Sequence, residues 1–331
     1  MRPRSYQSLA RKRSTTPEIP APRRKIAIWP RISIITPSYN QASYLEQTIE
    51  SVLSQDYPNL EYLVVDGGSM DGSVDIIRHY AGRLAYWISE PDNGQTDAIN
   101  KGLRHSTGEI LAYLNSDDYY LPGTLKAVAE HFSSHPDSDL VHGRCRYVDQ
   151  GGTKIGQQFG DIQSYCQILD LWDVWWNRRQ FVQPEVFWAR RITEKIGPLR
   201  EQLHYVMDYD YWLRILKAGG TVSRLDREVA CFRRTPEQKS THSARVSDEL
   251  LEVVHAELWD RSTRIPWRER RRLQGQWLYQ RDFCVAADQS LARHESKFQR
   301  WTRLGALAVQ HPQLFQVRDF RRRLFGRLLP F

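Results

Sequence analysis

Two adjacent carboxylates that follow a strongly apolar segment are the most informative chemical feature of this chain. Residues 110–114 are apolar and lead directly into Asn115, Ser116, Asp117 and Asp118. The pattern predicts a buried strand that ends in a cluster of short polar side chains. Neighbouring carboxylates repel each other unless a cation lies between them and a ligand, and the simplest such cation is a divalent metal carrying a diphosphate. A plain polar turn is the alternative, because Asp and Asn are favoured in turns.

The segments before this cluster alternate between two periodicities. Short apolar runs predict strands at 32–36, 60–65, 84–89 and 109–114. Helical spacing predicts helices at 43–55, 73–80 and 96–105. Such alternation indicates a parallel sheet with right-handed crossovers, in which ligands bind at the carboxyl ends of the strands. Polar residues accumulate at those ends, at 36–40, 66–71, 93–97 and 115–118.

Local signals predict where several elements begin and end. Pro37 is expected to close the first strand. Ser43 is expected to cap the first helix, with Glu46 completing a capping box. Beyond these, helices are expected at 124–132, 206–218, 247–260 and 268–310, with a strand at 139–148.

Charge is distributed unevenly along the chain. The net charge is +8, and residues 1–30 carry +7 while residues 261–331 carry +11, which leaves about −10 for residues 31–260. A nucleic-acid reader normally carries its basic face on the folded module itself. The acidic body therefore suits an enzyme with carboxylates in its cleft that touches something anionic elsewhere. Residues 1–30 are rich in Arg, Pro, Ser and Thr and are expected to be disordered.

Other features restrict the compartment and the class of enzyme. No apolar run approaches the roughly 18 residues of a membrane span, and no apolar segment of a secretory signal follows the basic start. The four cysteines, at 145, 166, 231 and 284, lack metal-ligand spacing, so reduced thiols in the cytoplasm are expected. No glycine-rich dinucleotide or P-loop fingerprint follows the first strand, which disfavours dehydrogenases and P-loop enzymes.

Several motifs follow one another along the chain. They are Thr36-Pro37-Ser38-Tyr39-Asn40, the segment 65–73 that begins Val65-Asp66-Gly67-Gly68-Ser69, the segment 92–102 that begins Asp92-Asn93-Gly94-Gln95-Thr96-Asp97, Thr107-Gly108-Glu109, the cluster 115–118, and the segment 207–214 that begins Met207-Asp208-Tyr209-Asp210-Tyr211-Trp212. Together, in this order, they resemble the family-2 glycosyltransferases of the GT-A fold. The resemblance covers roughly residues 31–245 and implies an α/β fold with a Rossmann-like, mostly parallel sheet flanked by helices. Residues 246–331 are then a basic, helical C-terminal extension.

The resemblance implies a nucleotide-sugar site at the carboxyl edge of the sheet. Tyr39 is expected to stack on the base and Asp66 to accept from a uracil N–H. The alternatives are an exposed turn aromatic for Tyr39 and a cap on the glycine loop for Asp66. The further donor-binding residues implied are Thr36, Pro37, Asp97, Lys101, Asn115, Ser116, Gln183 and Lys239.

The cluster 115–118 corresponds to the D-x-D-D motif of the family. Asn115 replaces the first Asp, so Asp117 becomes the leading ligand for Mg²⁺ or Mn²⁺ and Asp118 a second ligand or hydrogen-bond acceptor. A metal here offsets the charge that grows on the departing diphosphate.

Asp208 is the candidate general base, with Asp210 as the alternate. The family pattern is [ED]-D-x-D, and Met207 occupies the place often held by Glu. A base here takes the proton of the acceptor hydroxyl as that oxygen attacks the anomeric carbon with inversion. The alternative is that Asp208 caps the helix that follows it.

For three further segments the sequence leaves two interpretations open. Gln183-Pro184 resembles a loop that faces donor or acceptor, or simply opens a strand. Lys239, Ser240 and His242 lie where relatives keep a diphosphate-contacting loop, or form a solvated basic loop. The Trp-rich stretch 172–176 is either core or an acceptor platform.

These observations lead to one functional expectation and its competitors. The chain is expected to be an inverting, metal-dependent, non-processive hexosyltransferase that moves a sugar from a nucleotide sugar, uridine being favoured, to a saccharide or lipid-linked saccharide in polysaccharide or glycoconjugate biosynthesis. A nucleotidyltransferase and a non-catalytic saccharide-binding relative are the alternatives. The protein is expected to be cytoplasmic. Residues 311–331 combine an apolar stripe with arginines, which suits either peripheral contact with the inner face of an anionic membrane or packing on the body.

Overall fold

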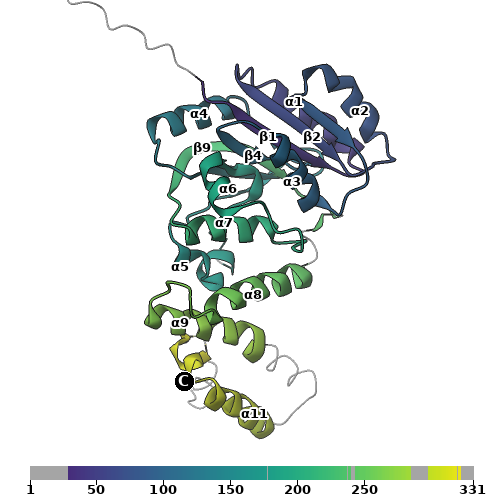
Figure 1. Cartoon of the computed structure of the whole chain (residues 1–331). Coiled ribbons are helices and arrows are strands. Elements are labelled where there is room, and N and C mark those ends of the chain that lie inside the picture. The colour runs from purple at the N-terminus through teal and green to yellow at the C-terminus, as the bar shows by residue number, and fades with distance from the viewer. Residues whose placement is uncertain are drawn as a thin grey trace, which may run out of the picture.

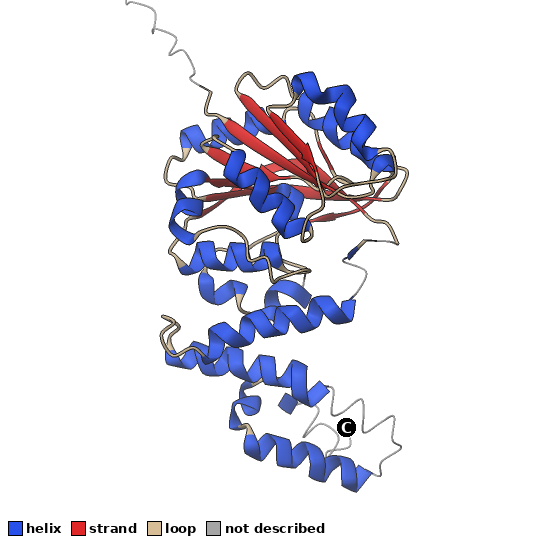
Figure 2. Cartoon of the chain, turned by 45° about the vertical axis from the view of Figure 1, so that its right-hand side comes forward, coloured by secondary structure: helices blue, strands red, loops and turns tan. Residues whose placement is uncertain are grey.

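The computed structural model describes residues 29–176, 178–236, 238–239, 243–284, 297–318 and 320–321. Its amino-terminal part is a sheet covered by helices, and its carboxy-terminal part is entirely helical (Figures 1 and 2). The expected basic segment 1–30 lies almost wholly outside the described residues.

Four parallel strands form the half of the sheet that the sequence predicts. They are β1 (Ile32–Ser38), β2 (Leu60–Asp66), β3 (Tyr86–Ser89) and β4 (Ile110–Tyr113), in the order β3-β2-β1-β4. The crossovers contain α1 (Ala42–Leu53), α2 (Ser73–Tyr80) and α3 (Gln95–His105). The carboxyl ends of the strands lie at one edge of the sheet, because Ser38 of β1 pairs with Asp66 of β2 and Ile35 of β1 pairs with Tyr113 of β4. The predicted parallel sheet is confirmed.

The other half of the sheet is mixed. β8 (Val186–Ala189) lies antiparallel between β4 and β6 (Leu140–Val148), and β9 (Val222–Arg233) runs parallel to β6. β5 (Tyr119–Tyr120) pairs with the end of β9, and β7 (Lys154–Gln158) pairs with β6. Because β5 directly follows the acidic cluster, the last residues of β9 lie beside that cluster.

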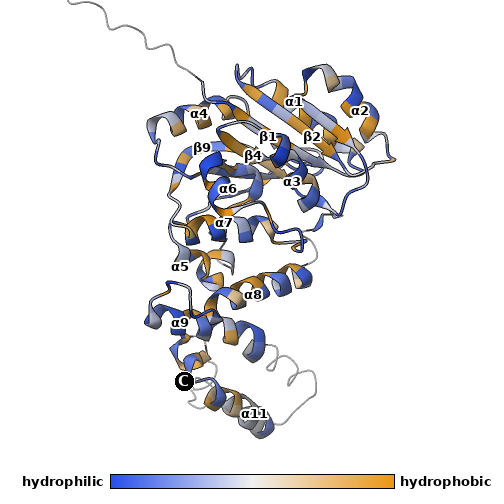
Figure 3. Ribbon diagram, viewed as in Figure 1, coloured by the Kyte–Doolittle hydropathy of each residue, from blue (hydrophilic) through white to orange (hydrophobic). Residues whose placement is uncertain are grey.

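The helices of this half complete the covering of the sheet. They are α4 (Thr124–Ser134), α5 (Tyr165–Ile168), α6 (Arg190–Ile196) and α7 (Met207–Lys217). Every residue of β1, β4 and β8 is buried, as expected for strands covered on both faces. Apolar residues are accordingly concentrated in the central strands (Figure 3).

Two local predictions for the start of the chain are wrong. Pro37 does not close β1, which continues to Ser38. The carbonyl of Ile35 accepts from Leu114 on the β4 side, and Pro37 has the same orientation, so its missing N–H faces the side on which β4 has already ended. Ser43 does not cap α1, because the helix begins at Ala42 and the backbone N–H groups of Gln41 and Ala42 donate to Ser73 and Asp71.

The carboxy-terminal part consists of α8 (Ser243–Trp259), α9 (Trp267–Leu278), a π-helical turn (Tyr279–Cys284), α11 (Lys297–Gln310) and a 3₁₀ turn (Pro312–Gln316). Within the helix expected over 268–310, α9 continues directly into the π-helical turn, and α11 covers the last 14 residues; residues 285–296 lie outside the described residues. Leu314 and Phe320 of the basic tail are buried, which agrees with packing of this part of the tail on the body. Residues 322–331 lie outside the described residues. No helix in the described ranges is long and apolar enough to span a membrane.

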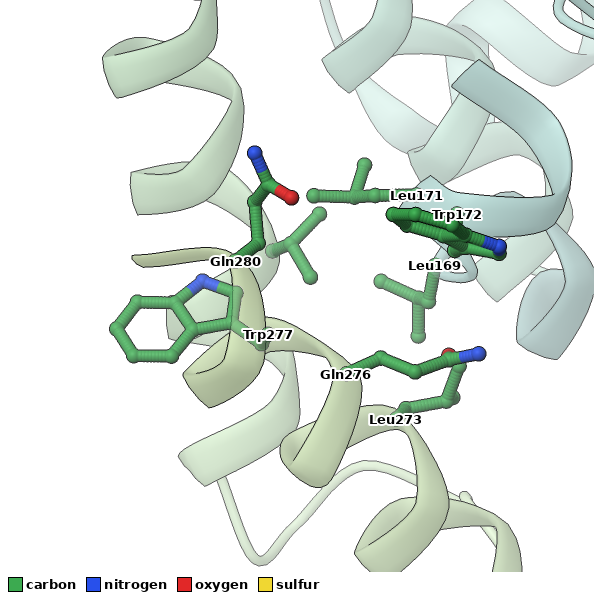
Figure 4. A pocket seen from close by; sticks show the side chains of 8 residues that line it. Leu169, Leu171, Trp172, Leu273, Gln276, Trp277 and Gln280 are labelled. Carbon is green, nitrogen blue, oxygen red and sulfur yellow. The ribbon is translucent and has the colours of Figure 1, made fainter. Parts of the chain in front are cut away.

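The Trp-rich stretch joins the two parts of the molecule. Trp172 lies against leucines at a junction with α9, where Trp277 and Gln276 approach from the other side (Figure 4). The cavity between them is about 10 Å³, room for one water molecule at most. Trp175 packs edge-on against Tyr209 of α7, with ring centroids 6.0 Å apart. These contacts support the packing interpretation for Trp172 and Trp175; the side chain of Trp176 lies outside the described set.

Candidate active site

The acidic cluster lies in the turn between β4 and β5. Asp118 is 1% exposed, and its Oδ1 accepts from the backbone N–H of Arg233 at 2.8 Å. Asp117 is half-buried, and its Oδ2 accepts from the Gln238 amide at 2.9 Å. The hydroxyl of Thr48 on α1 lies within hydrogen-bond distance of the carbonyls of Ser116 and Asp118. The turn is thus held from α1 and from the end of β9.

Arg233 is a buried residue of this site that the sequence did not identify. Its Nε donates to the carbonyl of Asp117 at 2.9 Å, and its terminal nitrogens donate to the carbonyl of Gln150 and to Gln47. Its guanidinium also lies over the rings of Tyr44 and Tyr119, at 4.7 and 5.4 Å from their centroids. The sequence does contain one signal that could have found it: Arg233 ends the apolar run Val229-Ala230-Cys231-Phe232.

The electrostatics of the pair fit a hard cation. Burial raises the pKa of Asp117, and burial together with the neighbouring Asp117 charge raises that of Asp118 well above its usual range. Asp118 Oδ2 is buried without a hydrogen-bond partner. The described residues contain no group of three or more His, Cys, Asp or Glu that would hold a metal by themselves. Two carboxylates with a free oxygen suit an ion whose other ligands come from phosphate and water.

A chain of side chains connects Asn115 to the segment after β9. Asn115 accepts from Gln95 at 2.7 Å, and Lys239 donates to the other end of Gln95 at 3.3 Å. Gln238 thus contacts the cluster directly and Lys239 reaches it through Gln95, while the contact of Lys239 with a diphosphate remains a prediction. Ser240 and His242 lie outside the described residues.

Asp66 is completely buried and holds the glycine loop after β2. Its carboxylate accepts from the backbone of Gly68 and Ser69 and from the hydroxyls of Ser69 and Ser89, at 2.5–3.1 Å. This is the cap that formed the alternative interpretation, and its contact with a uracil remains a prediction. Gly67 is required here, because a Cβ would lie 2.8 Å from the carboxylate of Asp92.

The residues at the end of β1 differ in accessibility. Tyr39 is 61% exposed beside the site, so its ring is free to stack on a base. Thr36 is buried and its hydroxyl lies 3.0 Å from that of Tyr62, so its side chain faces the core and its expected donor contact is not supported. Pro37 is buried within the strand. Ser38 has a buried hydroxyl without a partner, a polar atom that the sequence argument did not single out.

The other predicted donor residues lie near the same carboxyl edge of the sheet. Asp97 is buried and accepts from the backbone of Asn93, and Lys101 lies 3.0 Å from Glu90 and 3.6 Å from Asp97. Ser116 is buried in the turn itself. Gln183 is buried and donates to the carbonyl of Tyr113, while its Oε1 has no partner. The loop that contains Gln183 therefore lies against the end of β4.

Asp208 lies in the first turn of α7, where Val206 is the N-cap residue. Its Oδ1 accepts from the N–H of Tyr209 at 2.7 Å. Desolvation raises the pKa of Asp208 to about 6. Burial raises the pKa of the Tyr113 hydroxyl, and the nearby charges of Asp208 and Asp118 raise it further, so both carboxylates lie in the neighbourhood of this tyrosine. The expected alternative, Asp208 as helix cap, is wrong.

Asp210 has a structural role that corrects its nomination as alternate base. It is completely buried, and its two oxygens accept from Arg200 and Arg214, each at 2.9 Å. No oxygen is left to accept a proton from an acceptor hydroxyl without breaking an ion pair. Asp208 therefore remains the candidate base, and its role stays a prediction.

Comparisons with known proteins agree with this geometry. The chain matches the family described as glycosyl transferase family 2 over residues 33–200. An uncharacterized glycosyltransferase of Rickettsia typhi is 28% identical over 222 residues, covering 65% of this chain and 67% of that protein. A PGL/p-HBAD biosynthesis glycosyltransferase of Mycobacterium tuberculosis is 30% identical over 199 residues, covering 59% of this chain and 73% of that protein.

Solved structures show the same fold. Residues 1–349 of Staphylococcus aureus TarS in complex with UDP-GlcNAc superpose with a TM-score of 0.60 at 17% identity, covering 90% of this chain and 82% of that one. The mannosyltransferase PcManGT from Pyrobaculum calidifontis, in complex with GDP-Man and Mn²⁺, gives 0.58 at 19% identity, covering 91% and 85%. The expected GT-A fold is confirmed.

Proposed function

Because this chain belongs to glycosyl transferase family 2 and is a glycosyltransferase, we propose that it transfers one hexose from a nucleotide sugar to a saccharide or lipid-linked saccharide, with inversion. The observation that carries the proposal is the pair of adjacent carboxylates in the turn after β4, in which Asp118 is buried and its Oδ2 has no hydrogen-bond partner, while the charge of Asp208 acts on Tyr113 at the end of the same strand. Because the chain is a glycosyltransferase, the nucleotidyltransferase alternative is excluded. A uridine diphosphate sugar is the favoured donor, since TarS is a structural neighbour in complex with UDP-GlcNAc.

The proposed reaction forms one bond and breaks one. Tyr39 stacks on the base, and the edge formed by Asp97, Lys101, Asn115 and Gln183 orients the sugar diphosphate. Asp208 accepts the proton of the acceptor hydroxyl as its oxygen bonds to the anomeric carbon from the face opposite the diphosphate. The anomeric C–O bond to the diphosphate breaks, and the nucleoside diphosphate leaves with both electrons. Lys239, over the cluster, is close to where that negative charge develops.

Mg²⁺ or Mn²⁺ is the proposed cofactor, held by Asp117 and the partner-free Oδ2 of Asp118. Such an ion would supply electrostatic stabilisation of the leaving diphosphate. The support is the raised pKa of both carboxyls together with Mn²⁺ in the complex of the structural neighbour PcManGT. Metal binding should strengthen as pH rises, because both carboxyls must lose their protons.

Hydrolysis of a panel of nucleotide sugars with Mn²⁺ tests the function. The panel is UDP-glucose, UDP-galactose, UDP-GlcNAc, GDP-mannose and dTDP-glucose. We expect slow turnover of one donor to a nucleoside diphosphate and free sugar, and its loss with EDTA. Release of a nucleoside monophosphate and a sugar 1-phosphate, or no turnover of any donor, contradicts the proposal. Calorimetry with that donor should show Asp117→Ala losing at least tenfold in Mn²⁺-dependent affinity, as for loss of a metal ligand. Normal binding and turnover by this variant would show that the metal assignment is wrong.

We further propose that the basic tail contacts an anionic surface, because its arginines flank an apolar stripe in which Phe315 is 38% exposed. Arg318 and Arg321 are exposed. Full-length protein is expected to float with anionic but not neutral liposomes. A variant with the arginines of residues 318–327 changed to Gln keeps the apolar residues and should stay at the bottom of the gradient. Flotation of this variant would contradict the proposal.

A further inference from the structure

The first turn of α7, which carries Asp208, is held by a residue of the carboxy-terminal helices. Glu249 of α8 accepts from three successive backbone N–H groups, those of residues 204, 205 and 206, at 2.8, 2.6 and 2.8 Å. Arg245, one turn earlier on the same face of α8, donates to the hydroxyl of Tyr205 at 3.2 Å. Residues 204–206 directly precede Met207, the first residue of α7, so these bonds fix the chain where it enters the helix.

The other end of the same helix pair is also fixed. Glu257 lies two turns after Glu249 on α8 and forms an ion pair with Lys217, the last residue of α7, at 2.6 Å. Helices α7 and α8 therefore lie alongside each other with their N-termini at the same end. A carboxylate at the start of α7 is favoured by the helix dipole and by the unpaired N–H groups of the first turn. Glu249 supplies this carboxylate from outside the region that matches the family, which ends at residue 200.

We infer that Glu249 is a positioning residue for the proposed general base: it fixes the start of α7 and adds a negative charge beside Asp208. The inference rests on the proposed function of Asp208. It implies that α8 is part of the catalytic machinery through its hold on α7, although it need not touch substrate (Figure 1). Loss of the three hydrogen bonds should leave Asp208 free to shift from the acceptor hydroxyl, and displacement of a catalytic group by about 1 Å is enough to slow turnover strongly.

The charged groups around Asp208 determine the sign of the electrostatic effect. Beyond the main effect of burial, the charge of Glu249 on α8 raises the pKa of Asp208, and the charges of Asp208 and Asp118 both raise the pKa of Tyr113 at the end of β4. Lys239, after β9, interacts with Glu249 and Tyr205. The negative charge of Glu249 favours the protonated form of Asp208. Removing this charge, with Lys239 still present, makes Asp208 easier to ionise, so the acidic limb of the pH–rate profile should move to lower pH.

Two variants separate the geometric role from the charge. Glu249→Gln keeps an oxygen that can accept from residues 205 and 206 but removes the charge, whereas Glu249→Ala removes all three bonds. Glu252→Gln is the matched control: this exposed residue of α8 lines a cavity with Trp277 and Arg281 instead of facing α7. Each full-length protein is assayed from pH 4.5 to 8.5 for Mn²⁺-dependent hydrolysis of the donor identified in the panel. Rates are normalised to sites titrated with UDP, and melting temperatures are recorded alongside.

For Glu249→Ala we expect kcat to fall about tenfold or more while KM for the donor stays within twofold, since the donor contacts lie on other elements. Glu249→Gln should retain most of kcat and shift the acidic limb down by roughly half a pH unit. Glu252→Gln should match wild type. The inference is overturned if the acidic limb of the pH–rate profile of Glu249→Gln is that of wild type, or if Glu249→Ala has an unchanged kcat per titrated site. If Glu249→Ala does not fold, the position of the acidic limb in Glu249→Gln still tests the inference. If Asp208→Asn keeps the wild-type rate and limb, the base assignment itself is wrong, a result obtained without any Glu249 variant.

Discussion

The two ends of the candidate site are built in different ways. Asp117 and Asp118 lie in a turn of the sheet and are held by Arg233, from a strand that pairs with the adjacent β5. Asp208 lies on a helix that is held at its start by Glu249, from the carboxy-terminal helices. The end proposed to bind the metal thus depends on strand register, whereas the end proposed to bind the acceptor depends on helix packing. Donor affinity and turnover should therefore be separable by mutation.

The difference also agrees with the region that defines the family. The match at residues 33–200 contains Asp117 and Asp118 but ends before Asp208. The candidate base and its support from α8 therefore lie beyond the segment that the family match covers.

The largest effect is expected for Asp208→Asn. Removal of a general base should lower kcat by roughly 10² or more and leave donor affinity within twofold. Steady-state kinetics combined with calorimetry of donor binding measures the two quantities. Equal losses of both would show instead that Asp208 supports the structure of the donor site.

Asp210→Asn is the control for this comparison, because Asp210 lies in the same turn of α7 but is paired with Arg200 and Arg214. Breaking this buried group should destabilise the fold by about 3 kcal/mol. At a temperature where the variant remains folded, its kcat per titrated site should stay near that of wild type. A dead, fully folded Asp210→Asn beside an active Asp208→Asn would transfer the base role to Asp210.

A smaller effect is expected at the other end of the site for Arg233→Met. Loss of its bonds to the Asp117 carbonyl, Gln150 and Gln47 should loosen the turn and weaken Mn²⁺ binding by about tenfold, as for loss of an outer-shell partner. Arg233→Lys should not restore affinity, because one ammonium cannot reach three separate acceptors. Arg234→Met is the matched control, since Arg234 is exposed and lies over Tyr147. Calorimetric titration with Mn²⁺ in the presence of UDP measures the affinity, and wild-type affinity in Arg233→Met would contradict this account.

What could be predicted from the sequence depends on how far apart in the chain the interacting residues are. The strands and helices up to β4 follow from local periodicity, and the cluster 115–118 is recognisable because it ends an apolar run. Tertiary contacts decided the rest. The bond between Arg233 and Asp118 crosses 115 positions and that between Glu249 and Val206 crosses 43. Thr36 matches a family motif, yet the strand's alternation turns its hydroxyl to Tyr62. The capping box at Ser43 failed because a distant loop supplied the acceptors.

The smallest predicted effect concerns stability and tests the environment of Asp208 without any substrate. The folded-state pKa of about 6 lies above the ordinary value of 3.8. Between these values the folded state binds more protons than the unfolded state, so wild-type stability decreases as pH rises from about 4 to 6 and stays lower above that. Asparagine has no such titration and can still accept from Tyr209.

Asp208→Asn should therefore melt at the same temperature as wild type near pH 4 and roughly 2 °C higher at pH 7.5, a small gain because solvent still reaches part of this half-buried residue and screens its charge. Differential scanning calorimetry in EDTA measures the difference without any contribution from a bound metal. Asp75→Asn, whose ion pair with Arg78 lies on the exposed surface of α2, should leave the melting temperature unchanged at both pH values. An equal or lower melting temperature of Asp208→Asn at pH 7.5 would mean that the carboxyl is well solvated, and the acidic limb of the rate profile would then be expected near pH 4 instead of 6.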